Sequence, residues 1–238
     1  MFFPVRRVAL LLAVGGVTLA PAAVATSTYS NLETSGGWGS CGSKSCAGGG
    51  GTSTFLKKQV SSPSMTGAAE QFFIGGSNAF PSALWWKHIT TNNSVSHFRL
   101  DLYQYMSSPA ASNGIEYAAN QYYGGRWYKF STQCSFNKGV WSVWDSANRR
   151  WSGTGIGCTR PAANSWTHLV FEYARANGRA VFVSITINGS MHYLNKSFGP
   201  QSTSSGSNGD IGIHYQLNGK SSPTAYSSWV DKMTFTIW

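Results

Sequence analysis

The chain has 238 residues, of which 14% are aromatic and only 11% charged, and its formal net charge is +10. This length is enough for one β-sandwich with a substantial core. The lysines and arginines are scattered rather than gathered in a stripe, so we do not expect nucleic acid as a partner. The basic balance is compatible with an acidic polymer as ligand, but an ordinary basic secreted protein would have the same balance.

The first 25 residues have the pattern of a secretory signal peptide. A basic start at Arg6 and Arg7 precedes an apolar run at 8–19 that is short for a membrane span, and Ala23-Val24-Ala25 forms an A-x-A cleavage signal. We therefore expect cleavage after Ala25 and a secreted, extracellular protein that does not insert into a membrane.

Residues 26–54 are rich in glycine, serine and threonine, including four consecutive glycines at 48–51. This composition predicts a leader or a long loop, followed by a single domain over residues 55–238.

Four cysteines in an exported chain predict two disulfides, and the sequence alone allows three pairings. Pairing Cys41 with Cys46 would close a short loop, and pairing Cys134 with Cys158 would join two hairpins. We expect no metal site, because Cys41 and Cys46 lack C-x-x-C spacing and have no histidine at ligand spacing. Phosphate-loop and dinucleotide-binding glycine patterns are also missing from the sequence, so no cofactor is expected.

The sequence of the domain predicts an all-β fold, because short β-like runs alternate with turn residues and no helical pattern is convincing. The predicted strands cover residues 55–60, 69–74, 83–88, 95–106, 115–123, 126–133, 140–145, 166–174, 180–187, 191–195, 210–217 and 228–237. Hairpin turns are predicted at 146–148, 177–178 and 188–189. About a dozen strands at hairpin spacing predict an antiparallel β-sandwich of jelly-roll type.

The hairpin around Gly124-Gly125 shows the clearest difference between its two faces. A two-residue Gly-Gly turn would pair Tyr123 with Arg126 and Tyr122 with Trp127. One face then looks like core, and the other presents aromatic, amide and charged groups. That second face carries Glu116, Ala118, Asn120, Tyr122, Trp127, Lys129, Ser131 and Gln133.

Two further strands repeat this asymmetry, with polar faces rich in aromatic, imidazole and amide groups. In strand 95–106 the polar face carries His97, Arg99, Asp101, Tyr103 and Tyr105, and in strand 210–217 it carries Asp210, Gly212, His214 and Gln216. Aromatic rings stack on the apolar faces of sugars, and planar amides or carboxylates pair with hydroxyls. One of Trp85 and Trp86 must also face outward, but the sequence does not say which.

The segments SWTHLVFEYARANGRAVFVSITINGSMHYLN (165–195) and SWVDKMTFTIW (228–238) resemble parts of concanavalin A-like and laminin-G-like jelly rolls. The chain as a whole resembles secreted domains of that superfamily found in soil bacteria, over most of residues 55–238. The resemblance implies the sandwich fold. It leaves the activity open, because the superfamily includes lectins, glycosidases, lyases and adhesive modules.

The retaining glycosidases of this superfamily place three carboxylates on one strand, as E-x-D-x-E or E-x-D-x-x-E. This chain instead has Glu116-x-Ala118-x-Asn120, which retains only the first carboxylate. Asp101 is the best substitute for the second, if its strand neighbours the hairpin. A lyase would instead use histidine, tyrosine, arginine and glutamine, for which His97, Arg99, Tyr103, Gln133 and His214 are candidates.

The sequence therefore predicts a non-catalytic protein that binds a polysaccharide or glycan, acidic or neutral. Tyr122 and Trp127 would stack on sugar rings, while Glu116, Asn120, Lys129 and Gln133 would pair with hydroxyls or carboxylates. His97, Arg99, Asp101 and Tyr103 are expected to extend the site from a neighbouring strand. The alternatives are a glycoside hydrolase or polysaccharide lyase of the same fold, and an extracellular structural or adhesive protein.

Overall fold

The computed structural model describes residues 25–42, 46, 54–75, 78–203, 206–222 and 224–238. The predicted signal peptide lies outside the described residues except for Ala25, as do residues 43–45 and 47–53 of the predicted leader.

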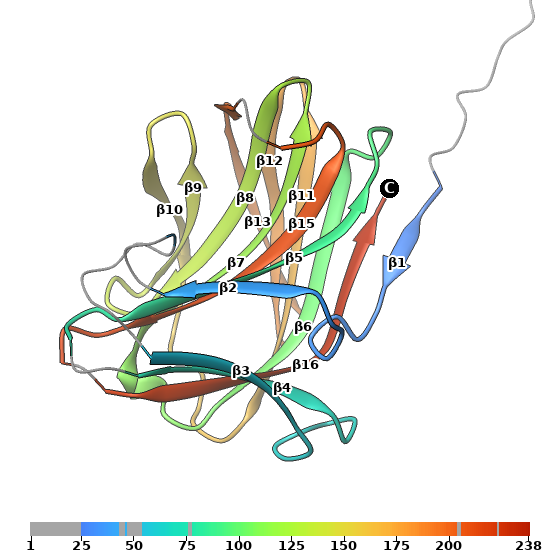
Figure 1. The fold of residues 1–238 in the computed structure, drawn as a ribbon. Coiled ribbons are helices and arrows are strands. Elements are labelled where there is room, and N and C mark those ends of the chain that lie inside the picture. Colours follow the sequence, from blue (N-terminus) through green and yellow to red (C-terminus); the bar gives the residue numbers. More distant parts are fainter. Residues whose placement is uncertain (1–24, 43–45, 47–53, 76–77, 204–205, 223) are drawn as a thin grey trace, which may run out of the picture.

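Two antiparallel sheets pack face to face as a β-sandwich, which confirms the predicted fold class (Figure 1). The first sheet has the order β13 (Ser190–Phe198), β12 (Arg179–Ile187), β11 (Trp166–Ala176), β6 (His97–Met106), β16 (Tyr226–Ile237), β4 (Ala69–Gly75) and β3 (Thr54–Val60), and β1 (Ser27–Tyr29) pairs with β16. The second sheet has the order β10 (Arg150–Gly157), β9 (Val140–Asp145), β8 (Arg126–Ser135), β7 (Ser112–Tyr123), β15 (Asp210–Gly219), β5 (Ser82–Thr91) and β2 (Trp38–Gly42), and β14 (Gln201–Ser202) pairs with β8. A short 3-10 helix (Pro109–Ala111) lies between β6 and β7.

The core lies between the sheets and is built from every second residue of each strand. Aromatic rings dominate its centre: Tyr117 of the second sheet stacks on Phe171 of the first at 4.8 Å between ring centroids. Phe72 of the first sheet packs against Trp85 and Tyr215 of the second. These contacts fix which face of each strand points outward, and so they set the chemistry of both outer faces.

The expected boundary between leader and domain differs from the structure. Within residues 26–54, β1 pairs with β16 and β2 pairs with β5 at the edge of the second sheet. Between these strands Glu33 is buried, and its two carboxylate oxygens accept backbone hydrogen bonds from Lys232 (3.1 Å) and Met233 (2.9 Å). This segment therefore belongs to the sandwich, although its glycine and serine content hides the strand pattern.

The two predicted disulfides are present, Cys41–Cys46 and Cys134–Cys158. All twelve predicted strands are found, and the described residues contain four further strands that were missed. Among these, β10 lacks the usual β-branched pattern because Gly153, Gly155 and Gly157 occupy alternate positions.

Candidate functional site

The hairpin of β7 and β8 has the predicted register. Tyr123 pairs with Arg126 and Tyr122 with Trp127, around Gly124 and Gly125 with φ of 58° and 68°. A two-residue turn with positive φ at both positions suits the right-handed twist of the strands, which explains the glycines. The predicted polar face of this hairpin forms part of the outer face of the second sheet, away from the core.

The outer face of the second sheet is hollowed into two pockets. The first, here called the carboxylate pocket, has a volume of about 510 Å³. The second, here called the tryptophan pocket, has a volume of about 320 Å³. Leu84 and Cys46 line both pockets, so the two are adjacent and together form one binding face that extends from β10 to β5.

An ion pair lines the carboxylate pocket. Glu116 is 6% exposed, and its Oε1 lies 3.8 Å from the Nζ of Lys129 on the neighbouring strand. The same ammonium lies over two indole rings, 5.7 Å from the centroid of Trp127 and 5.5 Å from that of Trp144. These contacts hold Lys129 in place and leave a paired anion and cation in a half-open, aromatic setting. Amide groups complete the lining, supplied by Asn113, Gln133, Gln216 and Asn218.

The tryptophan pocket is built around Trp86, which is 39% exposed, whereas its neighbour Trp85 is buried in the core. Trp86 pairs with Gly39 of β2, and a Cβ added at Gly39 would lie only 2.4 Å from Cε2 of the indole. The ring therefore rests on the backbone of β2, where no side chain could fit. An indole that is supported on one side and open on the other is a suitable stacking surface.

Three buried polar atoms of this outer face have no hydrogen-bond partner within the described part of the chain. They are Oδ1 of Asn120, the indole Nε1 of Trp127 and Oγ of Ser131. Buried polar groups are nearly always paired, because a missing hydrogen bond costs roughly 1–3 kcal/mol. An acceptor and a donor are thus left unpaired beside an exposed indole.

Tyr122 and Trp127 lie side by side with parallel rings, 5.7 Å between centroids and 1° between planes. Gly206 lies against the Tyr122 ring, since a Cβ added there would lie 2.2 Å from Cδ1. A ligand can therefore reach only the remaining surface of Tyr122, so Trp86 is the more accessible ring of this pocket.

His214 lies on β15 between Trp86 and Ala118 of the neighbouring strands. Burial lowers the pKa of its imidazole to about 3, and the positive charge of Lys129 acts in the same direction. The imidazole is therefore neutral at pH 7, where it can both donate and accept one hydrogen bond.

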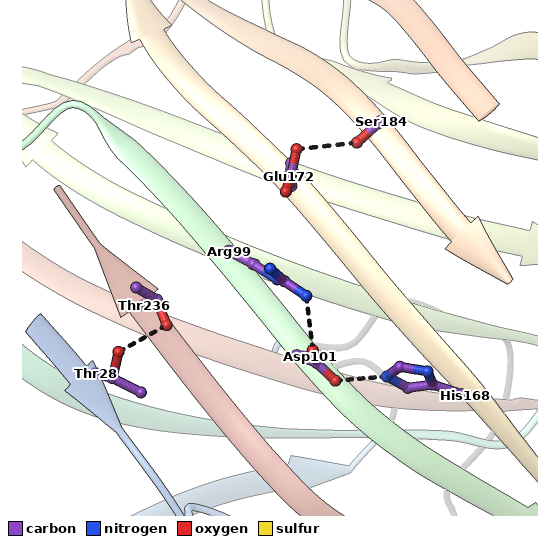
Figure 2. Close-up of polar contacts among 7 residues, drawn as sticks. All are labelled: Thr28, Arg99, Asp101, His168, Glu172, Ser184 and Thr236. Carbon is purple, nitrogen blue, oxygen red and sulfur yellow. Dashed lines mark hydrogen bonds and ion pairs between the residues drawn. The ribbon is translucent and has the colours of Figure 1, made fainter. Parts of the chain in front are cut away.

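Four predicted site residues lie elsewhere: His97, Arg99, Asp101 and Tyr103 are on β6, in the first sheet. Figure 2 shows Asp101 between Arg99 and His168, with Asp101 accepting from Arg99 Nη2 at 3.1 Å and meeting His168 Nε2 at 2.8 Å. The expectation that these residues extend the hairpin site is wrong, and a catalytic pair of Glu116 and Asp101 is excluded. The sequence does not reveal this, because the chain crosses from one sheet to the other between β6 and β7 and both strands alternate in the same way.

Several residues of the binding face were not among the predicted site residues, including Leu84, Trp86, His88, Trp144, Trp151, Asp210 and Asn218. Strand alternation from Leu84 and His88 would have placed Trp86 on their face. The contribution of β9 and β10 could not be found in this way, because β10 itself was missed.

The carboxylates of the chain are few, and all eight belong to described residues. Only Glu116 and Asp210 line the binding face, and Asp210 forms an ion pair with His88. Glu116 lies opposite Gln216, six residues from Asp210 along β15, which corresponds to roughly 20 Å. Glycosidase carboxyl pairs are separated by about 5 to 9.5 Å, so these two do not form one.

Within the described residues, no group of three or more His, Cys, Asp and Glu side chains is placed to hold a metal ion. A search of the same residues for a helix long and apolar enough to cross a membrane finds none.

The two sheets form an antiparallel β-sandwich. No protein-family model matches the chain, and no curated protein matches it. Among solved structures, the chain is similar to carbohydrate-binding modules of the β-sandwich superfamily at 8% identity, over 84% of this chain and 57% of that one, with a TM-score of 0.46. It is similar to the alginate lyase Aly36B, solved with an alginate trisaccharide, at 12% identity over 70% and 80% of the two chains, with a TM-score of 0.47. It is also similar to a family 11 carbohydrate-binding module of a Clostridium thermocellum cellulase, at 13% identity over 90% and 95%, with a TM-score of 0.42.

Proposed function

We propose that this chain is a secreted, non-catalytic carbohydrate-binding protein that holds a polysaccharide on the outer face of its second sheet. The observation that carries the proposal is the exposed Trp86 indole, supported by Gly39, beside the unpaired polar atoms of Asn120 and Trp127. Sugars offer this same combination, an apolar ring face bordered by hydroxyl groups.

Each contact has a definite role in this proposal. A pyranose ring stacks on Trp86, one hydroxyl donates to Asn120 Oδ1, and another accepts from Trp127 Nε1. In the carboxylate pocket, Glu116 and Lys129 accept from and donate to hydroxyls of the next sugar units, and Gln133 adds an amide. Because the ion pair is internally neutral, this pocket suits hydroxyls at least as well as uronate groups.

The size of the face favours a polymer over a single sugar. Each pocket alone has the volume of a site for a small organic ligand, and the two are adjacent along the sheet. A chain of several sugar units would fill both, with Leu84 between them.

Two features support binding without cleavage. The two carboxylates of the face are too far apart for the acid and base of a glycosidase. A lyase needs a base that can take a proton from the sugar ring, and the low pKa of His214 makes its imidazole a weak proton acceptor.

Affinity electrophoresis of residues 26–238 tests the proposal, with gels that contain neutral polysaccharides (β-glucan, xylan) or acidic ones (alginate, pectate). We expect retardation by at least one polymer, and at least a tenfold loss of affinity in Trp86→Ala, with a smaller loss in Trp127→Ala. Tyr193→Ala is the matched control, because Tyr193 is 67% exposed on β13 of the first sheet.

If Tyr193→Ala reduces the retardation and Trp86→Ala does not, the site lies on the first sheet and the proposal is contradicted. If no gel retards the protein, carbohydrate binding is contradicted and the structural or adhesive role is favoured. Shortening of the polymer during the run would contradict the non-catalytic assignment.

A further inference from the structure

A third pocket lies at one end of the sandwich, between the two sheets. It has a volume of about 260 Å³ and is here called the end pocket. Its walls come from both sheets and from the connection that follows Cys158, and they combine apolar and polar groups in similar proportion. The apolar and aromatic part of the wall includes Tyr117, Phe136, Trp141, Leu169 and Ile187.

One buried amide lies beside the aromatic part of the lining. Gln104 of β6 is 3% exposed, and its Oε1 accepts a hydrogen bond from the Tyr117 hydroxyl. Its Nε2 is buried and has no hydrogen-bond partner among the described residues. A donor of this kind is costly to leave unpaired, and Gln104 lines the end pocket.

We propose that the end pocket is a second binding site, which takes a small aromatic molecule bearing a neutral oxygen acceptor such as a ketone. The aromatic body would pack against the rings of Tyr117 and Trp141, and the oxygen would accept from Gln104 Nε2. This ligand class differs from the polysaccharide of the outer face, and the site does not depend on that proposal.

The chemistry of the walls argues for this class over a sugar. The unpaired amide donor of Gln104 and the neighbouring rings of Tyr117 and Trp141 match an aromatic body with one acceptor, whereas a sugar at the same place would set its hydroxyls against these rings. An apolar cavity of 150 Å³ is large enough for benzene, so a substituted ring fits a volume of 260 Å³. A neutral acceptor is favoured over a carboxylate at Gln104, because the side-chain amide carries no charge to balance an anion.

The mouth of the pocket is formed by the connection between β10 and β11. Arg160 lies there with its guanidinium carbon 5.4 Å from the centroid of the Phe136 ring. Ala162 in the same connection is exposed and also lines the pocket. A large side chain at position 162 would therefore close the mouth without changing the core.

The test uses acetophenone and ethylbenzene, which have similar shapes but differ in one ketone oxygen. The side-chain amide resonances of Gln104 are followed by ¹⁵N–¹H NMR in the full mature chain. Acetophenone should shift them with a dissociation constant on the order of 1 mM or tighter, as is usual for about nine heavy atoms. Ethylbenzene should bind roughly tenfold more weakly, because it leaves the amide unpaired.

Two variants locate the effect. Ala162→Trp should abolish binding of both compounds, and Gln104→Leu should remove the preference for acetophenone while ethylbenzene still binds. Trp86→Ala should leave both affinities unchanged, since that indole lies on the outer face of the second sheet. Trp141 fluorescence gives an independent readout of occupancy.

The proposal is overturned if acetophenone leaves the Gln104 amide resonances unshifted. It is also overturned if these resonances show contact with a bound water and none with acetophenone. It is also overturned if Trp86→Ala, rather than Ala162→Trp, removes acetophenone binding. None of these results bears on polysaccharide retardation, so the two proposals can fail separately.

Discussion

The indole of Trp86 rests on the backbone of Gly39, so close that a Cβ at position 39 would lie 2.4 Å from the ring. The two residues face each other across the β2–β5 pair at the edge of the second sheet. A glycine in a strand usually weakens it, and one reason to have it there is the close approach of another group. Here the approaching group is the exposed indole of the tryptophan pocket.

Gly39→Ala should therefore weaken polysaccharide binding while the protein stays folded. The added methyl group would push the indole away from β2 and misplace the stacking surface, so we expect a loss of about three- to tenfold in affinity, less than in Trp86→Ala. Because β2 is an edge strand, the melting temperature should fall by only a few degrees. Affinity electrophoresis and thermal circular dichroism measure the two effects.

Gly153→Ala is the matched control, since Gly153 is a strand glycine of the same sheet with nothing within 4 Å of an added Cβ. It should retain full affinity. An equal loss in Gly153→Ala, or no loss in Gly39→Ala, would contradict the supporting role of Gly39.

The sequence predicted the hairpin well because its signals are local. A Gly-Gly turn sets the register, and alternation then assigns each side chain of β7 and β8 to a face. Glu116, Asn120, Trp127 and Lys129 accordingly lie together on the outer face, as predicted. Their binding roles remain predictions.

The errors concern relations between distant segments. His97, Arg99, Asp101 and Tyr103 were assigned to the hairpin site because β6 has one polar face, but any sheet with a solvated side produces that pattern. Which sheet a strand joins depends on long-range packing, such as that of β6 between β11 and β16. The support that Gly39 gives to Trp86 was missed for the same kind of reason, since β2 lies in a segment that reads as a loop.

The ion pair of the carboxylate pocket should matter for stability as well as for binding. Lys129→Met would leave the Glu116 carboxylate buried without its cation, and we expect the free energy of unfolding to fall by about 1–3 kcal/mol. Glu116→Gln should cost less, because Lys129 is 25% exposed and keeps its contacts with the Trp127 and Trp144 rings. Urea denaturation gives both values.

The double variant Glu116→Gln/Lys129→Met completes the cycle. It should be more stable than Lys129→Met alone, because the unpaired buried charge is then gone. Strict additivity of the two single effects would show that the ion pair contributes no coupling.

Glu33 should make the protein less stable as pH rises. Burial raises the pKa of its carboxyl from 4.5 to about 7, and the nearby Asp231 carboxylate adds to the shift. A folded-state pKa above the unfolded value means that the stabilisation is complete below pH 4.5 and is lost as pH rises through 7. Glu33→Gln should remove this loss, on the order of 2 kcal/mol, and make the slope of stability against pH more positive between 4.5 and 7.

Urea denaturation at a series of pH values measures this slope. Glu172→Gln, which removes a half-buried carboxylate elsewhere in the first sheet, controls for the change in total charge. An unchanged slope in Glu33→Gln would contradict the assignment to this carboxyl.

His214 should act in the opposite direction over an overlapping range. Its pKa falls from 6.5 to about 3 in the folded protein, so its stabilisation is present above pH 6.5 and is lost as pH falls toward 3. His214→Gln should make the slope more negative between pH 3 and 6.5, whereas Glu33→Gln makes it more positive. NMR titration of the imidazole tests the cause, and a midpoint near 6.5 in the folded protein would contradict it.

The two disulfides should separate binding from stability. Cys134–Cys158 spans 24 residues and Cys41–Cys46 only five, so loss of the first should lower the free energy of unfolding by about 3 kcal/mol and loss of the second by about 2 kcal/mol. Polysaccharide binding should show the reverse order, because Cys46 lines both pockets of the outer face and Cys134 lines only the end pocket. The double variants Cys41→Ala/Cys46→Ala and Cys134→Ala/Cys158→Ala are compared below their melting temperatures. We expect only Cys41→Ala/Cys46→Ala to lose affinity for the polysaccharide. Equal retardation of both variants would mean that the short disulfide loop does not shape the binding face.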